Sequence, residues 1–271
     1  MKTENISTEY IMHMGDDLNV VNNARVSFDK EKAKFTDSDR SLIRFLATGF
    51  SKVEWNEMVS SVKSMSDLEV HKLFLKLRRH ATHWAPFAHP HVQVRITAPI
   101  FLARQYIKHQ IGLTWSEVSR RYVDSEPTFW MPGEWRARPE GGIKQGSSDK
   151  SISRLPHRSA DLTGSEWSVH EAAEYHVQEG LSLYLDMIEA QVAPELARSV
   201  LPQNMMVTWR WTGSLAAFAR VCQQRLDPHA QKEAQALGHQ ISGILSPLFP
   251  TSWDALVGDC LGHLEQPNGS A

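Results

Sequence analysis

The stretch ARQYIKHQIGLTWSEVSRRY, residues 103–122, concentrates cationic, carboxylate and hydroxyl side chains within twenty residues. Apolar residues recur at helical spacing after Pro99, which predicts a helix that begins near this proline and ends at Gly112. A polar loop is expected to follow the helix. Guanidinium groups bind phosphate through bidentate hydrogen bonds, and a carboxylate accepts hydrogen bonds from ribose hydroxyls or a ring N–H. The stretch therefore suits a phosphorylated, ring-bearing ligand, although a solvated helix end fits its composition equally well.

The remaining composition narrows the class of protein without naming it. The formal charge of the 271 residues is only −2, so no general attraction to nucleic acid or membranes is indicated. There is no leading apolar run that resembles a signal peptide and no run of about twenty apolar residues. Cys222 and Cys260 are too few for a disulfide framework and lack the spacing of a zinc site. We expect a cytoplasmic enzyme, in the host cytoplasm if the gene belongs to a phage.

The periodicity along the chain favours an α+β fold. Apolar spacing predicts helices at 39–50, 53–63, 67–80, 166–192, 214–226 and 228–245, with Asp39 and Asp67 as N-terminal caps. Alternating apolar and polar residues predict strands at 91–98 and 205–211. Residues 132–163, rich in Gly, Ser, Arg and Pro, are expected to form a surface loop or lid. We therefore predict one domain over 1–271, with a small, largely antiparallel sheet flanked by several long helices.

The second half of the opening stretch resembles the signature of the flavin-dependent thymidylate synthases. That signature reads Arg-His-Arg, seven residues, then Ser, with Glu two residues before the Ser and Arg two after it. In this sequence the positions are filled by Lys108, His109 and Gln110, and then by Glu117, Ser119 and Arg121. Two leading residues differ, and eight residues separate Gln110 from Ser119. This variant is more similar to phage-borne relatives than to typical bacterial ones.

Three further blocks resemble the same family and occur in the family's order. NNARVSF at 22–28 is similar to an early Ala-Arg-Val-Ser segment, and APFAHPHVQVRITAPIFLARQ at 85–105 resembles a Pro-Phe-Glu-His stretch that leads through a strand into the Arg-Gln helix. The segment at 194–233 resembles the block that runs from Ala-Arg-x-Val-Leu-Pro to Arg-x-x-x-His-Ala-Gln. The resemblance implies the fold of the thymidylate synthase-complementing proteins, and a homotetramer whose sites are shared between subunits.

The reaction implied by the resemblance is the reductive methylation of dUMP to dTMP. Methylenetetrahydrofolate supplies the carbon, and FAD reduced by NADPH supplies the hydride. Two alternatives stay open. The same scaffold can serve a pyrimidine nucleotide hydroxymethylase, and a relative that has lost flavin can be a non-catalytic nucleotide-binding protein.

Arg225 matches the arginine that the family places beside the uracil ring, where a guanidinium stabilises the ionised ring without a covalent nucleophile. From its local sequence alone, Arg225 can equally be a cation that stabilises a helix C-terminus. Arg198 matches a second substrate arginine, which is expected to come from a neighbouring subunit. The substrate positions implied by the resemblance are Gln105, Tyr106, Ile107, Lys108, Glu117, Val118, Ser119, Arg120, Arg121 and Arg198.

The flavin positions are where this chain departs most from the family. Those implied by the resemblance are His91, Lys108, His109, Gln110, Glu117, Ser214, Ala216 and Arg220. Family members usually carry Asn, Arg and then Asn or His at the last three positions, so Arg220 replaces the missing cation from one helical turn away. Arg25 and Ser27 are expected to contribute from another chain. The pair His89 and His91 lacks a nearby third ligand, so we predict no metal site.

Overall fold

Four antiparallel strands form the central sheet of the computed structural model, which describes residues 1–62, 64–79, 83–141, 146–159 and 166–261. The strands lie in the order β2 (Ser7–Met14), β3 (His91–Pro99), β8 (Met206–Ser214) and β4 (Leu113–Glu117). Two small pairs lie outside this sheet: β1 (Lys2–Thr3) runs parallel to β5 (Thr128–Phe129), and β6 (Arg154–Ser159) runs antiparallel to β7 (Glu166–Ser168). The predicted small, largely antiparallel sheet is confirmed.

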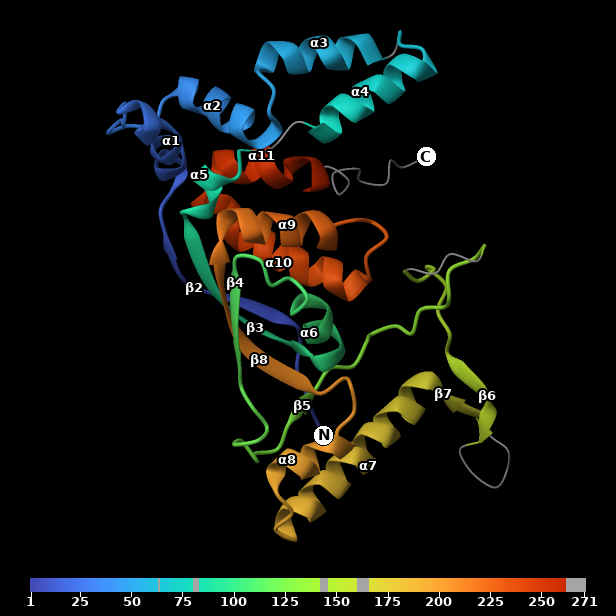
Figure 1. Cartoon of the computed structure of the whole chain (residues 1–271). Coiled ribbons are helices and arrows are strands. Elements are labelled where there is room, and N and C mark those ends of the chain that lie inside the picture. The colour runs from blue at the N-terminus through green and yellow to red at the C-terminus, as the bar shows by residue number, and fades with distance from the viewer. Residues whose placement is uncertain (63, 80–82, 142–145, 160–165, 262–271) are drawn as a thin grey trace.

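Helices gather at both ends of this sheet and over one of its faces (Figure 1). Their bounds are α1 Asp17–Arg25, η1 Val26–Phe28, α2 Asp37–Thr48, α3 Lys52–Val62, α4 Asp67–Arg79, α5 Ala85–Ala88, α6 Ile100–Tyr106, α7 Val169–Glu189, α8 Pro194–Ala197, η2 Arg198–Val200, α9 Leu215–Arg225, α10 Lys232–Leu248 and α11 Pro250–Leu261. In Figure 1, α2 to α4 lie at one end of the sheet, and α7 with α8 lies at the other. None of the helices in the described ranges has the length and apolar character needed to cross a membrane.

The covered face of the sheet carries the core. Alternate residues of β3 are fully buried, and two of them, Val94 and Ile96, pair with Trp211 and Trp209 of β8. Helices α6 and α9 close over these residues, with Tyr106 and Phe218 both edge-on to the Trp211 ring. Such buried aromatic rings supply much of the free energy that holds a sheet to its helices. The alternation predicted for 91–98 and 205–211 is therefore confirmed.

The opposite face of the same strands is polar. The Gln93 amide donates to the Thr212 hydroxyl at 2.8 Å, and Arg210 donates to the Gln93 carbonyl oxygen at 3.3 Å. Side chains that bond to one another across strands in this way keep their polar groups satisfied at a surface. The helices therefore pack mainly on the face that carries Trp209 and Trp211.

The region after α6 differs from its prediction. The helix begins after Pro99 as expected, but it ends at Tyr106 instead of Gly112, and residues 113–117 form strand β4 instead of a loop. Gly112 has a φ of +75°, a conformation that favours glycine, and it turns the chain into β4. Trp115 then stacks on Trp209 with 4.2 Å between ring centroids. Pairing with β8 and partial burial of this ring outweigh the polar composition of the segment.

Several other boundaries shift for local reasons. Thr36 caps α2, while Asp39 occupies the third helical position and completes a capping box with Thr36, so the prediction of Asp39 as the cap was wrong. Helix α7 begins at Val169 behind its cap Ser168, because residues 166–168 pair with β6. Helix α10 begins at Lys232, four residues after Pro228. Strand β2 and helix α11 were not predicted.

The segment predicted as a surface loop or lid at 132–163 is irregular only as far as Ser153, because β6 follows. An isolated antiparallel bridge between Arg136 and Ser151 brings the two sides of the irregular part together. Residues 142–145 and 160–163 of the predicted lid lie outside the described residues. The described part is therefore a folded excursion that begins after β5 and returns into the β6–β7 pair.

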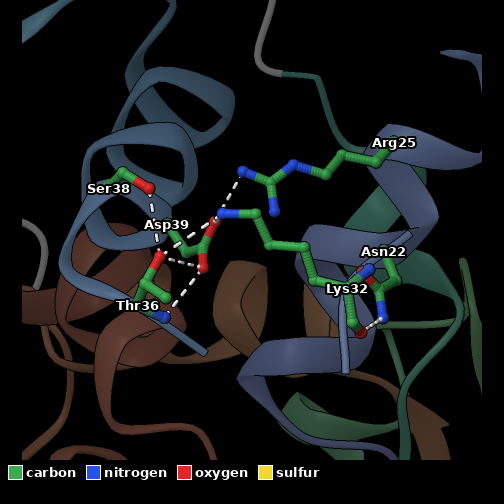
Figure 2. A network of polar contacts seen from close by, with 6 residues as sticks. All are labelled: Asn22, Arg25, Lys32, Thr36, Ser38 and Asp39. Atoms are coloured by element: carbon green, nitrogen blue, oxygen red, sulfur yellow. Dashed lines mark hydrogen bonds and ion pairs between the residues drawn. The ribbon is translucent and has the colours of Figure 1, made fainter. Parts of the chain in front are cut away.

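A charged network ties the connection between α1 and α2 to both helices (Figure 2). The fully buried Asp39 carboxylate pairs with Arg25 at 2.6 Å and with Lys32 at 3.2 Å, and it also accepts from the Thr36 hydroxyl at 2.7 Å. Burial opposes the charge on Asp39, but the hydrogen bonds from Thr36, Lys32 and Arg25 together lower its pKa to about 2. Asp39 therefore stays ionised and holds two cations in place.

Candidate active site

Half of the residues expected to bind flavin line a cleft at the N-terminal end of α9. The cleft has a volume of about 660 Å³, and His91, Ser214, Ala216 and Arg220 all line it. Ser214 caps α9, and its hydroxyl accepts from the Ala217 N–H at 3.2 Å. The rest of the lining is mostly apolar: Ala47, Trp84, Phe87, Ala88, Ile111, Gly112, Ala219, Gln223, Ala255 and Leu256. Four of the eight predicted flavin positions therefore share one cavity.

The turn at Gly112 forms one wall of this cleft and is fastened to α9. The Gly112 carbonyl accepts from the Ser214 N–H at 3.2 Å, and the neighbouring Ile111 carbonyl accepts from Arg220 Nη2 at 3.0 Å. A Cβ at Gly112 would lie 3.1 Å from the Ala217 Cβ. The backbone of the turn therefore approaches α9 as closely as a glycine allows.

Arg225 lies at the other end of α9 and is held by three groups of the opening stretch. Its Nε donates to His109 Nε2 at 3.0 Å, and its Nη2 donates to the backbone carbonyl of Gln105 at 2.7 Å. The guanidinium carbon also lies 5.4 Å from the centre of the Tyr106 ring. These bonds use two of the five guanidinium N–H groups, so donors remain for a ligand. Arg225 does lie at the C-terminal end of a helix, but its guanidinium is also held in a defined orientation by these contacts.

His109 acts as the acceptor in this pair. Burial, together with the charges of Arg225 and Arg220, lowers the pKa of His109 to about 4. The imidazole is therefore neutral at pH 7, and the Arg225 bond requires a lone pair on Nε2, which leaves the proton on Nδ1. A neutral ring can orient the guanidinium without repelling it.

Gln231 and Glu233, which the sequence analysis did not single out, extend a chain of hydrogen bonds from the Gln105 side chain. The Gln105 amide donates to the Gln231 carbonyl oxygen at 2.6 Å, and the Gln231 amide donates to Glu233 Oε2 at 2.8 Å. Both residues lie at the C-terminal end of the 194–233 segment, Gln231 within its His-Ala-Gln motif and Glu233 two residues later, so the resemblance of this segment was the available signal. Gln105, Arg225 and Gln231 line a smaller cavity together with Gly146, Gln223, Gln224, Asp227, His229 and Ala230.

The trailing half of the signature lies near the junction of α8 and η2. Arg121 pairs with Glu195, with Nε and Nη2 both 3.1 Å from Oε2, and Arg198 Nε donates to the Glu195 carbonyl at 3.3 Å. The Ser119 hydroxyl accepts from the Arg121 N–H at 3.3 Å. Two predicted substrate arginines therefore share Glu195, which the sequence analysis missed although it lies in the 194–233 segment.

Glu117 faces the same cluster from the end of β4. Desolvation by the surrounding chain raises the pKa of Glu117, against the lowering effects of the Trp115 indole and of Arg198. The indole N–H donates to Glu117 Oε2 at 3.2 Å. Arg120 is turned toward the Ser125 carbonyl, to which it donates. Of the other predicted substrate and flavin positions, those exposed at the surface are Ile107, Lys108, Gln110 and Val118.

The contacts described above hold the predicted residues in separate groups. Strand β4 separates Leu113, beside the cleft, from Glu117, and a five-residue strand spans about 13 Å. Helix α9 separates Ser214 from Arg225 by about 16 Å in the same way. The predicted residues thus form three groups: the cleft, the Arg225 group and the Glu117 to Arg198 cluster.

Arg25 and Ser27, expected to act from another chain, line a different cleft. It has a volume of about 860 Å³ between η1, α2 and α5, and its walls include Phe45, Trp84 and the two predicted residues. Arg25 Nη2 is taken by Asp39, whereas its Nη1 is buried without a hydrogen-bond partner among the described residues. Within those residues, no group of three or more His, Cys, Asp or Glu side chains is placed to hold a metal ion.

Comparison with known proteins decides the family. A sequence model of the family described as "Thymidylate synthase complementing protein" matches residues 9–251. The chain belongs to this family. A flavin-dependent thymidylate synthase of Thermotoga neapolitana is 28% identical over 92% of this chain and 89% of its own length, and one of Streptomyces avermitilis is 27% identical over 76% and 85%. The resemblance to flavin-dependent thymidylate synthases is confirmed.

Solved structures agree with the thymidylate synthase-complementing fold. A UMP/dUMP methylase, PolB from Streptomyces cacaoi, solved with 5-Br dUMP, superposes with a TM-score of 0.68. It is 22% identical to this chain and covers 95% of it, with 97% of the methylase matched. At this identity the likeness establishes the fold. The α+β architecture expected from the sequence is thereby confirmed.

Proposed function

We propose that this protein is a flavin-dependent thymidylate synthase that converts dUMP to dTMP. Methylenetetrahydrofolate is the carbon donor, and FAD reduced by NADPH supplies the hydride when bound. The observation that carries the proposal is the pair formed by Arg225 and a neutral His109, since it positions a cation in a chain of this family. The relatives named above bear the same activity in their names.

Arg225 serves the reaction as a fixed charge. A uracil ring placed with N3 and O4 at the remaining guanidinium N–H groups gains stabilisation of its ionised form, which makes carbon 5 a better nucleophile. Because His109 and the Gln105 carbonyl already orient the guanidinium, little reorganisation is needed as the charge develops. Cys222 is buried, and its thiol donates weakly to the Gly238 carbonyl at 3.7 Å. Arg225 thus replaces a cysteine nucleophile.

The cleft at the start of α9 fits a flavin nucleotide in shape and chemistry. Its walls are largely apolar, as a ring system requires, and its volume of about 660 Å³ is within the range of ligand pockets. Arg220 and the N-terminus of α9 offer positive charge to a phosphate group. We propose His91, Ser214, Ala216 and Arg220 as the residues of this chain that hold FAD.

The cluster at Glu117 fits the nucleotide's phosphate and sugar. Arg121 and Arg198 supply guanidinium groups, and Ser119 and Glu117 supply a hydroxyl and an acceptor. This cluster is separated from Arg225 within one chain, so we propose that two copies complete each site, as in a homotetramer. Apolar side chains stand exposed near the cluster and the turn before β4, where a partner subunit can cover them: Ile111, Val118, Tyr122 and Leu196.

The test is a product assay on the purified protein. We expect a flavin absorbance band, and NADPH oxidation that yields dTMP only when dUMP and methylenetetrahydrofolate are both present. Mass analysis of the product distinguishes a methyl from a hydroxymethyl group, and substrates with uracil and cytosine bases are compared in parallel. Colourless protein that binds nucleotide but no added FAD would support the non-catalytic alternative, and a hydroxymethylated product would support the other.

A further inference from the structure

Arg136, in the irregular segment after β5, reaches the first turn of α10. Its Nη2 lies 2.6 Å from Glu233 Oε1, and its Nε donates to the Ser147 hydroxyl at 2.7 Å. Both members of the ion pair are shielded, with 18% of the Arg136 side chain and 9% of the Glu233 side chain exposed. A shielded ion pair of this kind resists separation, because breaking it leaves an uncompensated charge away from water.

The pair connects to Arg225 through hydrogen-bonded side chains. Glu233 Oε2 accepts from the Gln231 amide, and the Gln231 carbonyl oxygen accepts from the Gln105 amide. The backbone carbonyl of Gln105 in turn accepts from Arg225 Nη2. Three residues, Glu233, Gln231 and Gln105, thus link Arg136 of the irregular segment to the guanidinium.

The charge on Glu233 fixes the direction of these bonds. Burial opposes its ionisation, yet hydrogen bonds from Arg136 and Gln231 lower the pKa of Glu233 below its ordinary value. An ionised carboxylate only accepts, so Gln231 must present its amide to Glu233 and its carbonyl oxygen to Gln105. The Gln105 side chain is thereby held as a donor.

We propose that Arg136 is a positioning residue for Arg225 and acts on it through Glu233, Gln231 and Gln105. This inference rests on the proposed function of Arg225, and it gives the segment after β5 a part in the reaction without contact to the substrate. When Arg136 releases Glu233, the carboxylate and the two glutamines can rearrange, and the carbonyl that fixes Arg225 moves with them. Small displacements of this kind near reacting groups cost on the order of tenfold or more in rate.

The experiment compares Arg136→Gln, Arg136→Lys, Glu233→Gln and the double variant Arg136→Gln/Glu233→Gln with the wild-type flavoprotein. Lys232→Gln is the matched control, since Lys232 pairs with Asp149 at 2.6 Å and so links the same segment to the same helix through an exposed contact. For each protein we measure kcat and KM with dUMP, flavin reduction by NADPH without nucleotide, and Tm.

We expect Arg136→Gln and Glu233→Gln to lower kcat/KM for dUMP by about tenfold while flavin reduction without nucleotide stays unchanged. Arg136→Lys should recover part of the loss, and the double variant should lose no more than the worse single variant, because both changes break one contact. Wild-type kinetics in either single variant, additive losses, or an equal loss in Lys232→Gln would overturn the inference. Should Arg136→Gln fail to fold, Arg136→Lys and Glu233→Gln supply the result. A wild-type protein without dUMP methylation contradicts the proposed function instead.

Discussion

At the scale of single residues, Arg225 carries the positive charge of the site, and a neutral His109 orients it. Because the pKa of His109 is lowered to about 4, the imidazole accepts from Arg225 over the whole neutral range. A protonated His109 has no lone pair for that bond and adds a second positive charge beside the guanidinium. The same neutrality that orients Arg225 therefore makes the folded state sensitive to acid.

This sensitivity gives a prediction for His109→Gln. Between pH 6.5 and pH 4 the unfolded chain binds a proton at His109 and the folded chain does not, so stability falls as the pH falls through this window, by up to about 3 kcal/mol. The glutamine variant keeps an acceptor and lacks this loss. Urea unfolding at a series of pH values measures the effect, with the exposed His229→Gln as control. Parallel curves for wild type and His109→Gln would contradict the assigned pKa.

At the scale of elements, the turn between α6 and β4 joins the cleft to the Arg225 group. The chain turns at Gly112, whose carbonyl accepts a hydrogen bond from the N–H of Ser214, the N-cap of α9, and then enters the strand that ends at Glu117. Little space separates the turn from α9. The geometry of this one connection therefore sets the positions of residues on both sides of it.

Gly112→Ala tests that connection. A positive φ costs a residue with a Cβ about 1–2 kcal/mol, and the new Cβ would also press on Ala217 at 3.1 Å. Gly141→Ala is the control, because its φ is +77° but its Cβ would meet no described atom within 4 Å. We expect Gly112→Ala to lower both Tm and FAD affinity, and Gly141→Ala to lower Tm at most. Equal FAD affinity in the two variants would count against the proposed cleft.

The helices and strands that could be predicted are those whose structure follows from the residue pattern within the element itself. The strands at 91–98 and 205–211 alternate because one face is buried, and Pro99 starts α6 by its fixed φ. Strand β2 escaped prediction because it lies at the edge of the sheet and exposes Tyr10, Met12 and Met14, which hides the alternation. Strand β4 escaped because its polar residues pair with β8, a partner about a hundred positions away.

The candidate site could be predicted only as a set of residues. The resemblance named Arg225, His109 and Arg121, but their partners depend on contacts that the sequence does not display. Glu195 and Gln231 lie in the 194–233 segment, but no pattern in it marks them as partners of these residues. Arg136 carried no signal at all, since it lies in a segment whose composition indicates only a loop. Such contacts follow from the packing of distant segments.

At the scale of the whole molecule, the separation of Arg225 from Arg121 predicts complementation between subunits. Arg225→Ala and Arg121→Ala should each remove most dUMP methylation as separate proteins. When the two variants are unfolded, mixed and refolded together, sites that combine both intact arginines recover about a quarter of wild-type activity. Activity assays on the mixture and on each variant refolded alone measure this. A mixture as inactive as its components would show that one chain carries the complete site.

The hydrogen bonds that orient Arg225 also determine under which conditions the folded chain can catalyse the reaction. Both partners, Gln105 and His109, lie more than a hundred residues before it in the sequence, so the bonds exist only while α6 is packed against α9. Local opening that parts two such elements can occur at a lower free energy than global unfolding. Local unfolding that separates α6 from α9 therefore leaves the Arg225 guanidinium without its orienting bonds while most helices remain folded. We expect enzyme activity to be lost before secondary structure during denaturation.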